Sequence, residues 1–499
     1  MVKENSFIKS DIFVLILLAA AKLTLHLLTN NQYGFHRDEL ATLHDARNLA
    51  WGFVAYPPLT PFLASIELKL FGTSLVGFRF FSALSQSIVM VIAGLMAKEL
   101  GGSRRAQIFT ALGTGIGILT LIQGALFQYV AFDFLWVVML TYFTIRLLKT
   151  DNPRWWLAIG ATSGLGMMTR YTMGVHVIGL ALAVLFTQAR KHLKSPWLWA
   201  GATIALIIFL PNIIWQVQHN FISLEFQTSI HERDVNVGRA DGYFTDQLLM
   251  ANPFMLPFWI AGLLFYFRES KCRMLAWMYL IPITVFFLMQ GRGYYPAPIY
   301  PMLIAAGAVV FERWLETLSR TTMLRYATLR WTAVLLGFII GGILMLPLAR
   351  INSAMWDISY AVHDNFSEQL GWREMNSQIA NIYHALPADE KPHTGILAGN
   401  YGEAGALALY GDEYDLPQII SPANSFWLQG APNANIDILI VVGYSKETAE
   451  EYFDTCVLTG EITNQYDVVN EESKNQNLFL CKGLRQPWPE LWIIMQRFM

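Results

Sequence analysis

Carboxylates and hydroxyls gather in a short stretch near the start of the chain. Residues 38–50 have a helical composition, and Asp38, Thr42 and Asp45 fall on one helix face, with Glu39 adjacent. One interpretation is a carboxylate base that takes a proton from an attacking hydroxyl group. The other is structural, because acidic side chains are favoured at helix N-termini. Spacing alone leaves both interpretations open.

Two isolated arginines could bind an anion. Arg170 precedes Tyr171, and Arg292 is followed closely by Tyr294 and Tyr295. A guanidinium group suits bidentate recognition of a phosphate. The alternative is an interfacial anchor, because arginines and tyrosines are also common where a helix leaves a membrane.

Three ionisable residues lie within apolar runs. Asp133 follows a Gln-Tyr-Val-Ala-Phe stretch, and Lys22 and His26 are four residues apart. An ionised group inside a membrane is costly and usually faces a cavity or a partner. We expect Lys22 either to pair with Asp133 or to extend towards the membrane surface. The structural alternative for Asp133 is a helix end near the interface.

Evidence for a metal or a nucleotide is weak. His231 and Glu232 are adjacent, but no His-x-x-x-His or Cys spacing accompanies them, so the sequence predicts no metal ligand set. The spacing of Gly399, Gly402 and Gly405 differs from the dinucleotide fingerprint. We therefore expect no cofactor from the residues alone.

The composition shows what must hold these residues. Of 499 residues, 54% are hydrophobic and only 14% are charged, with a mean hydropathy of +0.37. Soluble proteins are usually about 25% charged. The net charge of −2 argues against a nucleic-acid partner, and three cysteines are too few for a disulfide scaffold. The chain is therefore expected to be a polytopic helical membrane protein.

Apolar runs long enough to cross a bilayer recur through the first 348 residues. About eleven are expected, and the first is interpreted as a retained helix. They are 12–28, 76–97, 106–122, 127–145, 155–168, 173–187, 197–214, 251–267, 274–290, 298–312 and 331–348.

Basic residues predict the orientation of these spans. Eighteen, beginning with Lys3 and Lys9, fall in one alternating set of mostly short loops, and eight fall in the other set before residue 349. The positive-inside rule places the first set, with the N-terminus, in the cytoplasm. An odd number of spans then places the C-terminal region outside.

The C-terminal region, 349–499, has a different composition. It carries 20 acidic and 8 basic residues, a net charge of −12. Strand-like and helix-like pieces alternate, which predicts a small extracytoplasmic α/β domain. The predicted pieces are a strand at 396–398, a helix at 402–410, a strand at 436–442, a helix at 445–453 and a strand at 477–481. Cys456 and Cys481 both lie in this region and could form a disulfide, whereas Cys272 is expected in a cytoplasmic loop.

Several motifs together resemble a known family. The first outer loop, 29–75, contains Arg37-Asp-Glu-Leu40, then Ala46-Arg-Asn-Leu-Ala-Trp-Gly52 and Pro57-Pro58-Leu59. Further motifs are Phe78-Arg-Phe-Phe-Ser-Ala83, Glu99-Leu-Gly-Gly102, Phe132-Asp133, Gly164-Leu-Gly-Met-Met-Thr-Arg-Tyr171, Tyr294-Tyr-Pro-Ala-Pro-Ile-Tyr-Pro301, Asn400-Tyr-Gly-Glu-Ala-Gly405, Asn424-Ser-Phe-Trp427 and Cys481-Lys-Gly483. Their order resembles the family 39-like glycosyltransferases, which are relatives of dolichyl-phosphate-mannose protein mannosyltransferases and of the lipid A aminoarabinose transferase.

This resemblance implies a superfamily C glycosyltransferase fold. Residues 1–348 would form the transmembrane glycosyltransferase domain with its catalytic loop 29–75, and 349–499 the extracytoplasmic domain. The family's acidic motif falls on Asp38 and Glu39, with Asp38 as the expected base. The second family acid falls on Asp133.

The remaining implied site residues would bind the donor's sugar and phosphate. They are Arg79, Arg170, Tyr171, Arg292, Tyr294 and Tyr295. Relatives commonly have Lys in place of Arg170. Many carry Arg where this chain has Thr42, so Arg79 or Arg47 would have to substitute.

The implied reaction moves a sugar from a polyprenyl-phosphate donor to an acceptor hydroxyl on the extracytoplasmic side of the cell (inner) membrane, with inversion. The acceptor could be a protein, a lipid or a glycan, and the resemblance leaves a divalent metal ion open. An alternative is a transporter or flippase for lipid-linked sugars, for which Lys22 and Asp133 would be essential. A third is a non-catalytic assembly protein built around the acidic C-terminal region.

Overall fold

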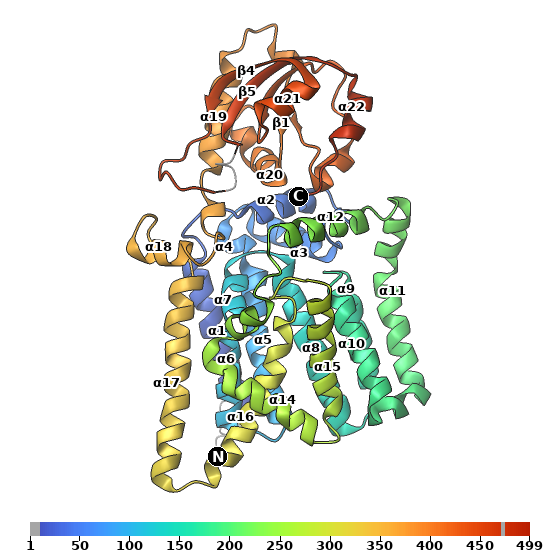
Figure 1. Cartoon of the computed structure of the whole chain (residues 1–499), viewed down its shortest axis with the longest axis vertical. Helices are drawn as coiled ribbons and strands as arrows, with labels where there is room; N and C mark the ends of the chain where they lie inside the picture. Colours follow the sequence, from blue (N-terminus) through green and yellow to red (C-terminus); the bar gives the residue numbers. More distant parts are fainter. Residues whose placement is uncertain (1–9, 471–474) are drawn as a thin grey trace, which may run out of the picture.

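The computed structural model describes residues 10–470 and 475–499. Lys3 and Lys9, which contributed to the expected orientation, lie outside the described residues. Upright helices form one end of the molecule and a small sheet forms the other, with short helices lying across the junction (Figure 1). The fold is thus mostly helical with a C-terminal sheet, as the sequence predicts.

Each of the eleven expected apolar segments coincides with a helix or with a bent helix pair. The helices are α1 (Asp11–Thr29), α5 (Phe80–Glu99), α6 (Arg104–Gly115) with α7 (Ile118–Ala125), α8 (Tyr129–Thr150), α9 (Trp155–Met167), α10 (Met173–Phe186), α11 (Pro196–Gln218), α14 (Leu256–Arg268), α15 (Arg273–Leu288), α16 (Tyr300–Glu316) and α17 (Arg320–Met345). By length and composition, five of the described helices could cross a membrane, or up to eight if each bent pair counts as one span. The five are α1, α5, α8, α11 and α17.

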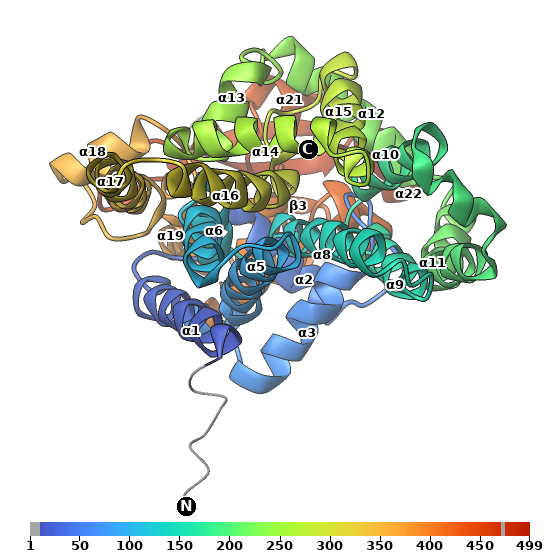
Figure 2. The same cartoon turned by 90° about the horizontal axis from the view of Figure 1, so that it is seen from below.

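Close backbone contacts hold the outlying helices to the bundle. Seen from below, α17 and α11 lie at opposite ends of it (Figure 2). A Cβ atom added to Gly160 of α9 would lie 2.0 Å from the carbonyl oxygen of Gly201 in α11. Small residues allow this approach, as in many membrane helix pairs.

Lys22 has a structural role that the sequence did not predict. Its ammonium group donates hydrogen bonds to the carbonyl oxygens of Gly115 and Thr120, at 3.0 and 3.1 Å. These oxygens lie at the break where α6 bends by 62° into α7. The expected pairing with Asp133, or extension to the membrane surface, is therefore wrong. Lys22 instead bonds to one carbonyl oxygen on each side of this bend.

The C-terminal sheet contains five strands in the order β2-β1-β3-β5-β4. Strand β1 (Thr394–Ala398) pairs in parallel with β2 (Ile419–Ile420) and β3 (Ile438–Val442), while β5 (Asn477–Leu484) is antiparallel to β3 and β4 (Phe453–Glu461). Strands β1 and β3 are buried along their whole length, which explains their unbroken apolar sequences. The predicted strands and helices of this region are confirmed, whereas β2 and β4 were missed.

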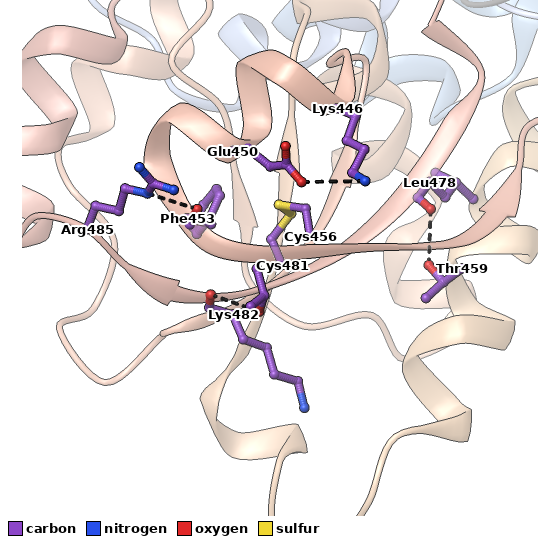
Figure 3. The surroundings of a disulfide bond; sticks show 10 residues. Lys446, Glu450, Phe453, Cys456, Thr459, Leu478, Cys481, Lys482 and Arg485 are labelled. Carbon is purple, nitrogen blue, oxygen red and sulfur yellow. Dashed lines mark hydrogen bonds and ion pairs between the residues drawn. A yellow bond between two sulfur atoms is a disulfide. The ribbon is translucent and has the colours of Figure 1, made fainter.

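A disulfide joins the two antiparallel strands β4 and β5. Cys456 and Cys481 are direct partners in the register, and both side chains are buried (Figure 3). The pairing that the sequence left open is therefore present.

Each face of the sheet packs against helices, and one of the two hydrophobic clusters extends into the first loop. One face packs against α22 (Trp488–Met495). The other packs against α19 (Trp372–Ala385) and α20 (Tyr401–Tyr410), and that cluster continues into Leu40 and Leu43 of α2 (Arg37–Arg47). The first loop therefore joins the bundle to the C-terminal region.

Candidate active site

Asp38 lies near the start of α2 and is held by two distant segments. His36 caps the helix, accepting a hydrogen bond from the Asp38 backbone N–H at 3.1 Å. One carboxylate oxygen of Asp38 accepts a hydrogen bond from the Tyr401 hydroxyl at 2.8 Å, and the other accepts one from the Gln128 amide at 2.9 Å. The Asp38 side chain nevertheless keeps 36% of its surface exposed. It is therefore oriented and still accessible.

The charges around Asp38 favour its ionised form. Burial raises the pKa of its carboxyl group, but the electrostatic influence of His36, Arg37 and Arg292 and the Tyr401 hydrogen bond outweigh it, so that the pKa lies below its ordinary value. The carboxylate is thus ready to accept a hydrogen bond from a hydroxyl group at neutral pH.

Glu39, the neighbour of Asp38, is in a different environment. Its carboxylate forms a two-point ion pair with Arg79, at 2.8 and 2.6 Å, and also accepts hydrogen bonds from the backbone N–H groups of His36 and Phe127. Both Glu39 and Arg79 have fully buried side chains. Neither lines the cavity that contains Asp38. The Glu39–Arg79 pair therefore lies outside this cavity and anchors the start of α2, whereas catalysis by Glu39 and donor binding by Arg79 stay predictions.

A cavity of about 380 Å³ opens in front of Asp38. Its walls come from α2, the starts of α8 and α10, the segment after α15, α12 (Ile222–Asn236) and the C-terminal region. The expected site residues that line it are Asp38, Arg170, Tyr171, Arg292 and Tyr295. Asp133 and Tyr294 lie behind this wall and contact Arg170.

Arg170 is enclosed by tyrosine rings. Its guanidinium carbon lies 4.9, 5.3 and 4.6 Å from the ring centroids of Tyr129, Tyr294 and Tyr295. The Nη1 atom of Arg170 also lies 3.6 Å from a carboxylate oxygen of Asp133. These contacts fix a cation at the cavity wall, and cation–π contacts of this kind are strongest where water is excluded.

Arg292 is not an isolated cation. It makes a two-point ion pair with Asp234 of α12, at 2.6 and 3.0 Å. Arg233 and Arg239 approach the same carboxylate at 3.5 and 3.4 Å. Three arginines thus share one aspartate, which leaves a positive excess at the cavity rim. The sequence does not indicate Arg233, Asp234 or Arg239 as site residues, because ion-pair partners in a long polar stretch have no distinctive spacing.

Asp45 is a second carboxylate in the cavity wall. It accepts a hydrogen bond of 2.6 Å from the Tyr56 hydroxyl, which lies 3.4 Å from the Thr42 hydroxyl. Burial raises the pKa of Asp45 to about 7, with the Tyr56 hydrogen bond acting in the opposite direction. The helical spacing from Asp38 pointed to this residue, but burial and the tyrosine contact could not be predicted.

Tyr171 positions the wall opposite α2. Its hydroxyl donates to the Asn212 carbonyl oxygen at 3.3 Å and accepts from the Gln216 amide at 2.8 Å. Both partners lie in α11, so that Tyr171 connects this outlying helix to the cavity.

A metal site finds no support in the geometry. Among residues 10–470 and 475–499, no group of three or more His, Cys, Asp and Glu side chains could hold an ion. His231 lines the cavity without companions of that kind. The three glycines 399, 402 and 405 allow close packing against neighbouring segments.

Comparison with known proteins agrees with the resemblance drawn from the sequence. Residues 55–215 match the profile of the dolichyl-phosphate-mannose-protein mannosyltransferase family. An uncharacterized protein of Aquifex aeolicus (strain VF5) is 28% identical over 166 residues, and the matched part spans 32% of the chain and 32% of that relative.

Similar solved structures extend over nearly the whole chain. ArnT from Cupriavidus metallidurans in the apo state superimposes with a TM-score of 0.58 at 12% identity, covering 93% of this chain and 97% of ArnT. ArnT bound to undecaprenyl phosphate gives a TM-score of 0.57 with the same identity and coverage. An Archaeoglobus fulgidus oligosaccharyltransferase in complex with Zn and sulfate gives 0.50 at 13% identity, covering 87% of this chain and 68% of that one. The chain therefore shares the fold of ArnT, and the resemblance to the mannosyltransferase and aminoarabinose transferase families that the sequence suggests is confirmed.

Proposed function

We propose that the protein is a membrane glycosyltransferase that moves a sugar from a polyprenyl-phosphate-linked donor to an acceptor hydroxyl group. The observation that carries this proposal is a single cavity lined both by the accessible carboxylate Asp38 and by the cations Arg170 and Arg292. The family profile and the likeness to ArnT with bound undecaprenyl phosphate support the donor class.

In the proposed reaction, the acceptor oxygen forms a bond to the anomeric carbon as the bond from that carbon to the phosphate oxygen breaks. The electron pair of the broken bond leaves with the polyprenyl phosphate, whose charge Arg170 and Arg292 stabilise. Asp38 accepts the hydrogen bond, and then the proton, of the attacking hydroxyl. Because the acceptor itself is the nucleophile, we expect inversion at the anomeric carbon.

We further propose that the cavity faces the extracytoplasmic side of the cell membrane. The basic residues of the alternate short loops favour this orientation. The disulfide between Cys456 and Cys481 also favours it, because such bonds persist in oxidising compartments. The C-terminal region would then cover the cavity from outside.

The geometry gives less support to a transporter. That hypothesis required Lys22 and Asp133 as charges within a pathway. Lys22 is instead bonded to the carbonyls of the α6–α7 break, and Asp133 lies beside Arg170 behind the cavity wall.

The direct test substitutes Asp38 with Asn, which keeps the shape of the side chain and removes the carboxylate. We expect sugar transfer in membranes to fall roughly 10²–10⁴-fold, as for loss of a general base. Asp412→Asn, at an exposed position of the C-terminal region, is the matched control and should leave transfer unchanged. Full activity of the Asp38 variant would refute the assignment. Mass spectrometry of glycans and lipids from a deletion strain would identify the sugar and the acceptor.

A further inference from the structure

One residue of the C-terminal region contacts Asp38 at the cavity wall. Tyr401, which lies 363 positions after Asp38 in the sequence, donates its hydroxyl hydrogen bond to an Asp38 oxygen at 2.8 Å. It also lines the cavity, and the Arg37 guanidinium lies 5.5 Å from its ring centroid. The C-terminal region therefore contributes a side chain to the site itself.

The backbone around Tyr401 is tightly fixed. Tyr401 is the first residue of α20, directly after β1 and the cap residue Asn400. The Asn400 side chain accepts a hydrogen bond from the Glu403 N–H at 2.9 Å, and the Glu403 carboxylate accepts one from the Asn400 N–H at 3.2 Å. This reciprocal capping box sets the direction in which the helix leaves the sheet.

Two glycines let α20 lie directly on α2. A Cβ atom added to Gly402 would meet the Arg37 Cβ at 2.8 Å, and one added to Gly405 would meet the Leu40 carbonyl carbon at 2.7 Å. The glycine spacing that did not fit a dinucleotide site is thus explained by helix packing. It brings Tyr401 within hydrogen-bonding distance of Asp38.

We propose that Tyr401 is a positioning residue for Asp38, so that the C-terminal α/β region completes the active site. With Gln128 bonded to one carboxylate oxygen and Tyr401 to the other, the carboxylate plane cannot rotate. Each oxygen keeps its second lone pair for the substrate hydroxyl. This inference rests on the proposed function for its catalytic consequence.

The charged and titratable groups around Asp38 determine what a pH profile would report. These groups lie at the start of α2 beside Asp38, in the first loop, in α8, in the segment after α15 and in the C-terminal region. They are His36, Arg37, Tyr56, Tyr129, Arg292, Glu368 and Tyr401. Tyr401→Phe removes one of these influences and leaves the ring against Arg37.

The first experiment measures sugar transfer by the full-length Tyr401→Phe variant. We expect kcat to fall roughly ten- to hundredfold, as for one hydrogen bond to a charged group, with KM for the donor changed less than twofold. The acidic limb of the pH profile should move to higher pH, because the lost hydrogen bond stabilised ionised Asp38. Tyr444→Phe is the matched control, since its buried hydroxyl has no hydrogen-bond partner among the described residues. Wild-type kcat and an unmoved pH limb in Tyr401→Phe would overturn the proposal.

A second experiment separates this inference from the proposed function. Melting temperatures of purified wild type, Asp38→Asn, Tyr401→Phe and the double variant form a cycle that needs no substrate. Direct coupling predicts that the two changes are not additive. If wild type transfers no sugar but the cycle shows coupling, the proposed function fails and the positioning role stands. Additive changes in melting temperature would overturn the positioning role.

Discussion

Two carboxylates of one helix face the same cavity in opposite electrostatic environments. Asp38 has a pKa held below its usual value by neighbouring cations and the Tyr401 hydroxyl, despite burial that raises it. Asp45 is buried beside Tyr56, and burial raises its pKa to about 7. Such divergence within one site often marks separate proton-handling roles. The accessibility of Asp38 agrees with the proposal that it activates the acceptor hydroxyl.

The raised pKa of Asp45 predicts how the stability of the folded protein changes with pH. Because its pKa is higher in the folded protein than in the unfolded chain, the folded state binds more protons between about pH 4 and pH 7, and stability falls as pH rises through that window. Asp45→Asn removes this contribution. We therefore expect the melting temperature of the variant, relative to wild type, to rise from pH 4 to pH 7. Asp412→Asn is the control, and a constant difference across that range would contradict the assigned environment.

Arg170 should contribute to the stabilisation of the leaving phosphate. We expect Arg170→Gln to lower kcat roughly 10²–10³-fold, as for removal of a preorganised charge-stabilising donor. Arg170→Lys should restore part of the loss, since lysine keeps the charge but not the two-point geometry. Arg485→Gln, in the C-terminal region, tests for a general effect of losing an arginine. Transfer by Arg170→Gln within twofold of wild type would remove Arg170 from the mechanism.

The sequence identified two of the cavity cations, Arg170 and Arg292, but could not distinguish Asp38 from Glu39 by environment. The two differ because the Arg79 side chain reaches Glu39 from 40 residues further along the chain. Tyr401 was part of a motif used only for resemblance. Nothing in its spacing indicated contact with Asp38, because that contact depends on how two distant segments pack.

At the scale of elements, α2 both carries the cavity carboxylates Asp38 and Asp45 and packs against the C-terminal region. Its start is fixed by the Glu39–Arg79 pair, and its face packs against α20. The position of the cavity carboxylates therefore depends on contacts on both sides of this helix. A change at the α2–α20 contact should affect activity without touching a cavity residue.

Gly405→Ala tests that contact. The added methyl group would meet the α2 backbone at Leu40, so we expect a loss of about 1–3 kcal/mol in stability and reduced transfer. Gly411→Ala, at the end of the same helix, meets atoms only at ordinary contact distances of 3.6 Å or more. It should be neutral or slightly stabilising. Equal thermal stabilities and activities for the two variants would show that the close packing is unimportant.

Elements with long apolar runs or buried parallel strands were predictable, because their patterns are continuous. Strand β4 was missed, since it is an edge strand whose side chains are mostly exposed and do not alternate regularly between buried and exposed. The break between α6 and α7 was also missed, and so were the hydrogen bonds that Lys22 of another helix donates on either side of it. The apolar pattern within a segment indicated that a helix or strand is present. Its exact ends depend on contacts with distant residues, which the local pattern does not contain.

At the scale of the whole molecule, charge is strongly segregated. The near-neutral sum of −2 combines 27 basic and 17 acidic residues before position 349 with a net −12 after it. The disulfide lies on the acidic side of this division. Both features support an orientation with the C-terminal region outside the cytoplasm.

Thiol labelling in intact cells tests this orientation. Cys272, in the segment between α14 and α15, should react with a membrane-impermeant maleimide only after permeabilisation. A cysteine introduced at exposed Ala434 of the C-terminal region should react without it. The reverse pattern would place the cavity on the cytoplasmic side.

The most direct measurement is release of polyprenyl phosphate by the purified protein in liposomes that contain a polyprenyl-phosphate sugar and an acceptor. The proposed mechanism predicts release in step with sugar transfer by wild type and by Asp412→Asn. It predicts release roughly 10²–10⁴-fold slower for Asp38→Asn. Equal release by Asp38→Asn and wild type would contradict the assignment of Asp38 as the residue that activates the acceptor.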